Sequence, residues 1–224
     1  MSSLIQSIES RQDGESLEAG RNLYLFRVPK FRHRHAQTYA LLYNKEMVLI
    51  DAVHDITRPA VEELRKNYRI AGILLTHSDL IDQAFGTMDE VAEWAGADIY
   101  AHHADHKEQN IKDLSGLQQG PLAEYHIQFR HIPGHTPGSC VYYDPGMGRL
   151  FTGDSAVGSA YGSADTGFTH PPVEEEQWPA FKDGWENVNF NVVEVYPLHG
   201  KPATEGIDLE ELKKNMQDPG RVMS

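Results

Sequence analysis

Short apolar runs alternate along the chain with polar segments that contain turn-forming residues. The runs at 22–28, 38–43, 47–52 and 70–75 have strand length, and Asn44 begins the turn between the second and the third. Their β-branched and aromatic content is typical of strands. The pattern therefore predicts a series of consecutive strands in the first third of the chain.

Two segments in the first half carry apolar residues at helical spacing. A helix is predicted over 58–68, with Thr57 as its cap and Pro59 in its first turn. A second helix is predicted over 82–94, before a short strand at 97–101. Strands and helices thus begin to alternate after the first strands.

The second half follows a similar order. Strands are predicted at 125–132, 139–143, 149–152 and 192–196, and helices at 173–187 and 208–216. The last helix opens with Asp208 and Glu211 at capping-box spacing. The loop at 155–170 is long enough to predict a functional or mobile role. Together the elements favour an α/β fold in which each half supplies a helix layer and a sheet layer.

Length and charge narrow the class of protein. A chain of 224 residues buries one substantial core, which predicts a single domain over 1–224. No apolar run reaches bilayer length, and the first residues lack the pattern of a signal peptide, so we expect a cytoplasmic protein with no membrane partner. The formal net charge of -13 argues against nucleic acid and favours a small-molecule substrate. The composition is compatible with a monomer or a dimer.

Cysteine and basic residues add two expectations. Cys140 is the only cysteine, which excludes an internal disulfide and a cysteine-based zinc cluster. We expect Cys140 to be packed, and any metal to be held by histidine and carboxylate. Positive charge gathers at 27–35, which is either a solvated turn or a rim that attracts anionic substrates.

Residues of the types that bind metals follow four predicted strands directly. Strand ends are rigid positions from which imidazoles and carboxylates can converge on one ion. The sequence therefore predicts a metal site. The candidate ligands are His77, Asp79, Asp82, His135, Asp154 and His199. Asp82 and Asp154 are also the candidate catalytic residues.

Five short motifs occur in an order and at separations that are distinctive together. They are Leu49-Ile50-Asp51-Ala52, Thr76-His77, Pro133-Gly134-His135-Thr136-Pro137-Gly138, Thr152-Gly153-Asp154 and Pro197-Leu198-His199-Gly200. In these motifs the chain resembles the metallo-β-lactamase superfamily, which includes glyoxalase II hydrolases, lactonases and persulfide dioxygenases. The resemblance implies a four-layer αββα sandwich. It also implies that His77 and His135 hold a first metal, that Asp154 bridges, and that His199 belongs to a second.

One motif departs from the family pattern, His-x-His-x-Asp-His. Here it reads His77-Ser78-Asp79-Leu80-Ile81-Asp82, so that only the first ligand is kept and Ile81 cannot coordinate. The ligand set gains one carboxylate, which should lower the Lewis acidity of a bound metal. Without metal, the carboxylates should repel unless one has a raised pKa or a basic neighbour. Asp79 and Asp82 also suit a structural role at a helix start.

The resemblance favours a metal-dependent hydrolase of a small-molecule ester, thioester, lactone or related bond. Zinc is the first choice of cofactor, with Fe²⁺ or Mn²⁺ as alternatives and one or two ions per chain. His77, His135 and Asp154 also make the two-His-one-carboxylate set of non-haem iron, so a persulfide-dioxygenase-like oxidoreductase is an alternative. The loss at Ile81 supports a third hypothesis, a non-catalytic binding module.

Several other polar residues lie near these motifs. Asp51 is predicted to support the ligands rather than bind metal. Tyr161 and His170, in the long loop, are candidates to contact substrate. Three histidines after the strand at 97–101 are predicted as surface imidazoles and not as ligands: His102, His103 and His106.

Overall fold

The computed structural model describes residues 3–31, 34–107, 110–165 and 167–223. The strands are β1 Ser16–Gly20, β2 Leu23–Phe31, β3 Arg34–Tyr43, β4 Glu46–Ile50, β5 Arg69–Leu74, β6 Ile99–Ala101, β7 Ile111–Asp113, β8 Gln128–His131, β9 Cys140–Asp144, β10 Arg149–Gly153, β11 Val157–Gly158, β12 Phe168–Thr169 and β13 Glu194–Pro197. The helices are α1 Ser3–Glu9, α2 Arg58–Arg65, α3 Asp79–Asp82, α4 Met88–Ala95, α5 Trp178–Glu186 and α6 Leu209–Gln217.

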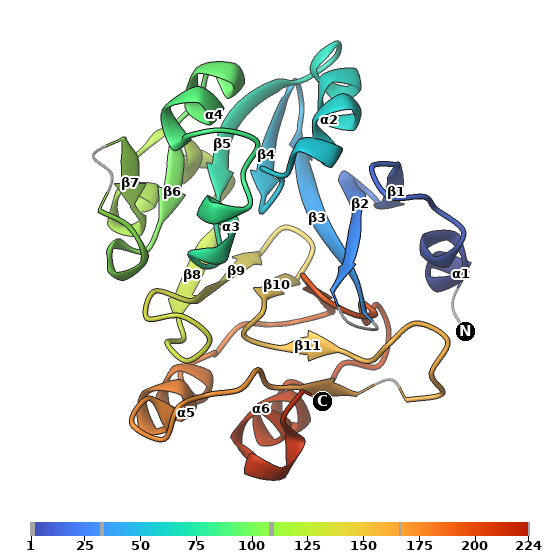
Figure 1. The fold of residues 1–224 in the computed structure, drawn as a ribbon, viewed down its shortest axis with the longest axis vertical. Helices are drawn as coiled ribbons and strands as arrows, with labels where there is room; N and C mark the ends of the chain where they lie inside the picture. The colour runs from blue at the N-terminus through green and yellow to red at the C-terminus, as the bar shows by residue number, and fades with distance from the viewer. Residues whose placement is uncertain (1–2, 32–33, 108–109, 166, 224) are drawn as a thin grey trace.

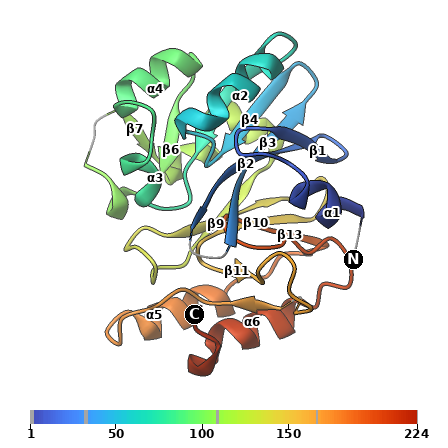
Figure 2. The same cartoon turned by 45° about the vertical axis from the view of Figure 1, so that its right-hand side comes forward.

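Two sheets form the centre of the molecule. The larger has seven strands in the order β1-β2-β3-β4-β5-β6-β7, antiparallel as far as β4 and parallel from β4 to β7. The smaller has four strands in the order β13-β10-β9-β8, and β13 runs parallel to β10. In Figures 1 and 2, α2 and α4 lie beyond the large sheet, and α5 and α6 lie beyond the small one. The strands β11 and β12 form a separate ribbon.

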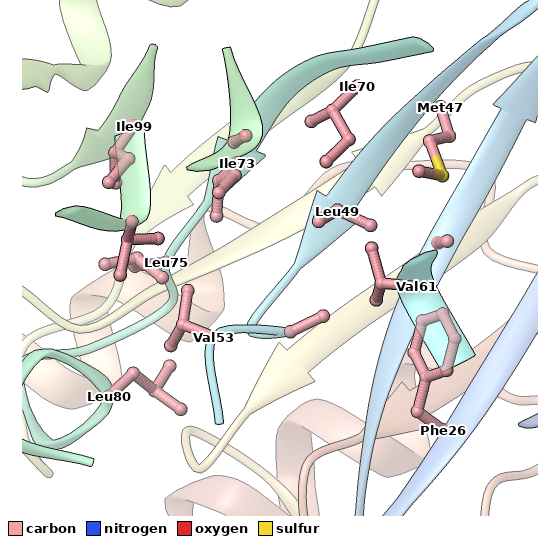
Figure 3. Close-up of a cluster of buried hydrophobic side chains, with 14 of the residues drawn as sticks. Phe26, Met47, Leu49, Val53, Val61, Ile70, Ile73, Leu75, Leu80 and Ile99 are labelled. Carbon is pink, nitrogen blue, oxygen red and sulfur yellow. The ribbon is translucent and has the colours of Figure 1, made fainter. Parts of the chain in front are cut away.

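The alternation of side chains along each strand explains this layering. In β4, Met47 and Leu49 join the cluster that packs under α2 and α4. Figure 3 shows both side chains near Val61 of α2. The intervening Val48 and Ile50 join the cluster between the two sheets. Successive side chains of a strand point to opposite faces, so a continuous apolar run indicates a strand that is buried on both faces.

The small sheet is covered on both faces in the same way. In β10, Leu150 packs with α5 and α6, whereas Phe151 packs between the sheets against Tyr39, at 5.1 Å between ring centroids. Trp185 of α5 is fully buried on the outer side. Helix, sheet, sheet and helix therefore follow one another, which confirms the predicted αββα sandwich.

The helix predicted over 82–94 is wrong as a continuous element. The structure has two short helices, α3 and α4, with residues 83–87 between them. Thr87 caps α4: its side chain accepts a hydrogen bond from the backbone of Glu90, whose carboxylate accepts one in return from the backbone of Thr87. This capping box begins a new helix, and it prevails over the helical spacing of apolar residues that runs through the break.

Other element boundaries also differ from prediction. Thr57 does not cap α2 with its side chain: its backbone is already helical, and its hydroxyl donates to the carbonyl of His54. The helix predicted over 173–187 begins only at Trp178, and the strand predicted over 125–132 begins only at Gln128. The cap at Asp208 is confirmed, since its carboxylate accepts from the first-turn amides of α6.

The basic segment is not a solvated turn at Arg27. This side chain is 2% exposed, donates to the Ile8 carbonyl at 2.6 Å and lies 3.7 Å from the Asp13 carboxylate. Residues 32–33 of the segment lie outside the described part of the chain. None of the helices in the described ranges combines the length and apolar character that spanning a bilayer requires.

Candidate metal centre

The ends of strands from both sheets supply the candidate ligands. His77 follows β5 of the large sheet, and Asp154 and His199 follow the parallel strands β10 and β13 of the small sheet. His135 lies in the loop between β8 and β9. The two sheets are in contact here: the backbone amide of Gln37 in β3 donates to the backbone carbonyl of Leu198, the residue before His199, at 2.8 Å.

Three of these residues face a common point. One ligand atom each from His77, His135 and Asp154 lies within 4.8 Å of the others. The Oδ2 atom of Asp154 is 3.9 Å from Nε2 of His77 and 3.7 Å from Nε2 of His135. His199 contacts the same carboxylate from its other side, where Nδ1 donates to Oδ1 at 2.6 Å. Of the six predicted ligands, the structure thus brings five to one pocket, these four and Asp79.

Asp154 is held in its charged form. Burial alone raises its pKa, but the hydrogen-bonded imidazole of His199, with the nearby imidazoles of His77 and His135, lowers it further than burial raises it. The net effect holds the pKa of Asp154 well below its usual range. The repulsion among carboxylates expected from the sequence is therefore relieved at Asp154 by its imidazole neighbours.

A buried hydrogen-bond chain orients His77. Asp51, in a left-handed conformation with φ of 60°, accepts the backbone amide of Thr76 at 2.8 Å and its hydroxyl at 2.9 Å. Thr76 Oγ1 also lies 2.9 Å from Nδ1 of His77. A hydroxyl has one proton, so Thr76, having given it to Asp51, accepts from Nδ1–H of His77. The lone pair of Nε2 then points into the site, which agrees with the supporting role predicted for Asp51.

Burial shifts the pKa values of Asp51 and His77, the two ends of this hydrogen-bond chain. It raises the pKa of Asp51 to about 7, even though the two hydrogen bonds from Thr76 lower it. It also lowers the pKa of His77, against the opposing effect of Asp154. Near neutral pH, His77 is therefore a neutral imidazole, which is the form that binds metals.

Asp105 fixes the loop that carries His135, and the sequence analysis missed it. Its carboxylate accepts the Thr136 hydroxyl and the Gly138 amide, both at 2.6 Å. A Cβ at Gly138 would lie 2.5 Å from the Asp105 side chain, so a glycine is required at this position. The available signal was that Asp105 follows β6, whose carboxyl end lies at the same sheet edge as that of β5.

A family comparison agrees with this geometry. The model of the metallo-beta-lactamase superfamily matches residues 33–184, which is more than half of the chain. The chain belongs to the metallo-beta-lactamase superfamily.

Solved metallo-beta-lactamases have the same fold. The enzyme FIM-1 from Pseudomonas aeruginosa, in its mono-zinc form, is 17% identical, with 91% of this chain and 92% of that chain covered and a TM-score of 0.61. The metallo-beta-lactamase from Erythrobacter litoralis is 14% identical, with coverages of 90% and 93% and a TM-score of 0.64. The one from Hirschia baltica is 16% identical, with coverages of 91% and 95% and a TM-score of 0.57. At these identities the likeness shows the fold alone.

The altered superfamily motif is only partly turned toward the site. Asp79, the first residue of α3, lies 3.3 Å from His135, measured from Oδ2 to Nε2. Ile81 packs instead against the apolar cluster between the large sheet and the helices α2 and α4. Asp82 ends α3 and is not among the residues that line the metal pocket, so its role as ligand or catalyst stays a prediction.

The histidines after β6 form a group of their own. The ring of His102 stacks on that of His131 at 3.8 Å and on that of His103 at 4.4 Å. Burial and these neighbouring imidazoles lower the pKa of His102 to about 4. Within the described residues, the group with the spacing of a metal site is His77, His135 and Asp154, and the prediction that His102, His103 and His106 are not ligands stays a prediction.

The ligands open into a pocket of about 360 Å³ with largely apolar walls. Neither Tyr161 nor His170 lines it: the Tyr161 hydroxyl donates to the Gln37 side chain at 3.1 Å, and His170 is buried behind Pro171. Cys140 is fully buried, and burial raises the pKa of its thiol, so the predicted packing role is confirmed.

Proposed function

We propose that this protein is a metal-dependent hydrolase of small-molecule ester, thioester, lactone or related bonds. Its cation, zinc in the first place, would be held by His77, His135 and Asp154. The observation that carries the proposal is the meeting of two imidazole Nε2 atoms and one carboxylate at a single point. Two imidazoles and a carboxylate, with an open position for a reactant, are a typical ligand set of catalytic zinc.

The side chains present fit a cation. Nε2 of His135 is buried and makes no hydrogen bond, although carboxylate oxygens of Asp79 and Asp154 lie 3.3 and 3.7 Å away. A buried, unpaired imidazole nitrogen is costly unless something coordinates it. The FIM-1 enzyme in its mono-zinc form supports zinc as the first choice of ion. Because Ile81 offers no donor, we propose one ion at the first site.

The bound cation would supply Lewis acidity for the attack of water on a carbonyl or phosphoryl centre. The protein residues have separate roles. Asp51, when ionised, and Thr76 keep the coordinating nitrogen of His77 free of a proton. Asp79, whose side chain is 49% exposed, is placed to accept a proton at the mouth of the site. The apolar walls exclude bulk water, which strengthens electrostatic interactions within the pocket.

The proposal is tested by removing metal and reconstituting the protein with zinc, iron or manganese. We expect about one equivalent of zinc in the protein and in His103→Ala, whose side chain is 71% exposed, and loss of that metal in His135→Ala. Hydrolysis of a thioester, a lactone, an aryl ester and a β-lactam is then compared among the three. Less than about a tenth of an equivalent with every metal would overturn the hydrolase proposal and favour a binding module.

The same three ligands support a second candidate function. Two histidines and one carboxylate suit non-haem Fe(II), which leaves positions for oxygen. The protein reconstituted with Fe(II) would then consume oxygen in the presence of a persulfide and would hydrolyse none of the four substrates. Hydrolysis without oxygen consumption would exclude this candidate.

A further inference from the structure

Residues 218–223, which follow α6, lie along the segment that carries His170. We call residues 218–223 the strap. Val222 forms a parallel bridge with His170, whose amide donates to the carbonyl of Arg221 at 3.1 Å. The amide of Met223 donates in return to the carbonyl of His170 at 2.8 Å.

The imidazole of His170 joins the strap to the pocket wall. Its Nδ1 lies 2.6 Å from the carbonyl oxygen of Pro171, and its Nε2 lies 3.1 Å from that of Asp218, where the strap begins. The ring is 3% exposed and lies 4.9 and 5.9 Å from the rings of Trp178 and Phe181. Both contacts are hydrogen bonds only when each ring nitrogen carries a proton; a neutral imidazole donates to one of the two carbonyls.

The residues that this bridge fixes also line the metal pocket. Pro171 and Met223 belong to its wall, together with Val28 and Leu198 and the candidate ligands. These four apolar residues thus form part of the pocket wall. Methionine is unbranched and polarisable, and it adapts to apolar groups of different shape.

We propose that the strap places Met223 as a specificity-determining side chain for substrates with an apolar substituent, and that His170 is the positioning residue that pins the strap. This inference rests on the proposed function in so far as it takes the metal pocket as the substrate pocket. An extended alkyl group would lie along Met223, whereas a substrate without one would leave this wall uncovered.

The wall is tested with two chelating probes, acetohydroxamate and octanohydroxamate, on the zinc-reconstituted protein. We expect octanohydroxamate to bind more tightly, and Met223→Asn to weaken its binding about tenfold while leaving acetohydroxamate binding unchanged. Val222→Asn is the matched control, because Val222 is 45% exposed and is not among the lining residues. An equal preference in the wild-type protein and Met223→Asn would overturn the assignment.

The positioning role of His170 is tested with His170→Gln, which keeps one donor group. Hydrogen exchange at the Met223 amide should become about tenfold faster, while amides within α5 keep their rates. The ratio of the two hydroxamate affinities should also fall toward that of Met223→Asn. A merely structural role for His170 would lower thermal stability without changing this ratio, and an unchanged ratio would overturn the proposal.

Failure of the proposed function gives a different result. A protein that binds no metal contradicts that function, yet the Met223 amide still reports on the strap. In that case octanohydroxamate is added to the metal-free protein, and the methyl signal of Met223 is followed by NMR. A shift with octanohydroxamate and not with acetohydroxamate supports the wall, and no shift with either overturns it.

Discussion

Replacing Asp51 by asparagine removes a buried acid on which the orientation of His77 depends. Burial raises the pKa of Asp51 from 3.8 to about 7. Because the folded pKa is the higher one, the contribution of this group to stability is fully present below the unfolded pKa and is lost as pH rises through the folded pKa. A shift of about three pKa units corresponds to about 4 kcal/mol across this window.

The assay is urea unfolding of the metal-free protein and of Asp51→Asn between about pH 4 and pH 8. Asparagine keeps an acceptor for the Thr76 amide but does not ionise. The free energy of unfolding of the wild-type protein should therefore fall by about 4 kcal/mol relative to the variant over this range. Asp98→Asn, at an exposed position, is the control and should follow the wild-type profile. Parallel profiles for the wild-type protein and Asp51→Asn would refute the reasoning.

The same variant should bind zinc less well. The amide group of asparagine donates to Thr76 Oγ1, so the Thr76 hydroxyl turns to donate to Nδ1 of His77. The ring proton of His77 then moves to Nε2, the nitrogen that faces Asp154. We expect a loss of about 10-fold to 100-fold in zinc affinity by calorimetry, and an unchanged affinity would contradict the hydrogen-bond chain.

Three further variants test the surroundings of the site. Gly153→Ala should destabilise the protein and release zinc, because φ is 51° there and a Cβ would collide with the Thr76 hydroxyl; chemical denaturation and metal analysis measure both effects. Asp105→Ala leaves the Gly138 amide without its acceptor and the Thr136 hydroxyl with only Ser139 Oγ, and it should cost about 1–3 kcal/mol in urea unfolding, whereas an unchanged stability would mean that water replaces the carboxylate. His199→Ala removes the main partner of Asp154, so the pKa of Asp154 should rise and the free energy of unfolding near neutral pH should fall; a pH titration by NMR would show an unmoved pKa if His199 has no such role.

The layers of the fold could be predicted from the sequence, because the order of apolar and polar residues along a strand indicates which of its faces are buried. The apolar run at Met47–Ile50 requires apolar neighbours on both sides, and the structure provides a helix layer on one and a sheet on the other. The break at 83–87 was not predicted, because the apolar spacing continues across it and only the pair Thr87 and Glu90 marks the new start.

The site was predictable where a ligand type follows a strand directly, as at Asp154 and His199. Spacing along the chain does not show which side of a short helix faces a neighbour, so the sequence did not distinguish Asp79, at the site, from Asp82. Asp105 and Met223 reach the site through contacts between segments far apart in sequence. Such contacts are set by tertiary packing; the position of Asp105 after β6 was the one local signal, and none pointed to Met223.

The candidate ligands come from both halves of the sandwich, with His77 on the seven-stranded sheet and Asp154 and His199 on the four-stranded one. An ion at this point would link the two sheets directly. Its binding energy would therefore oppose any displacement of one sheet relative to the other. Chelation should then weaken the coupling between the two sheets without separating them, because the apolar cluster between them remains. Loss of the ion would first allow small displacements between the two sheets near the metal site, while the strand pairing within each sheet is kept.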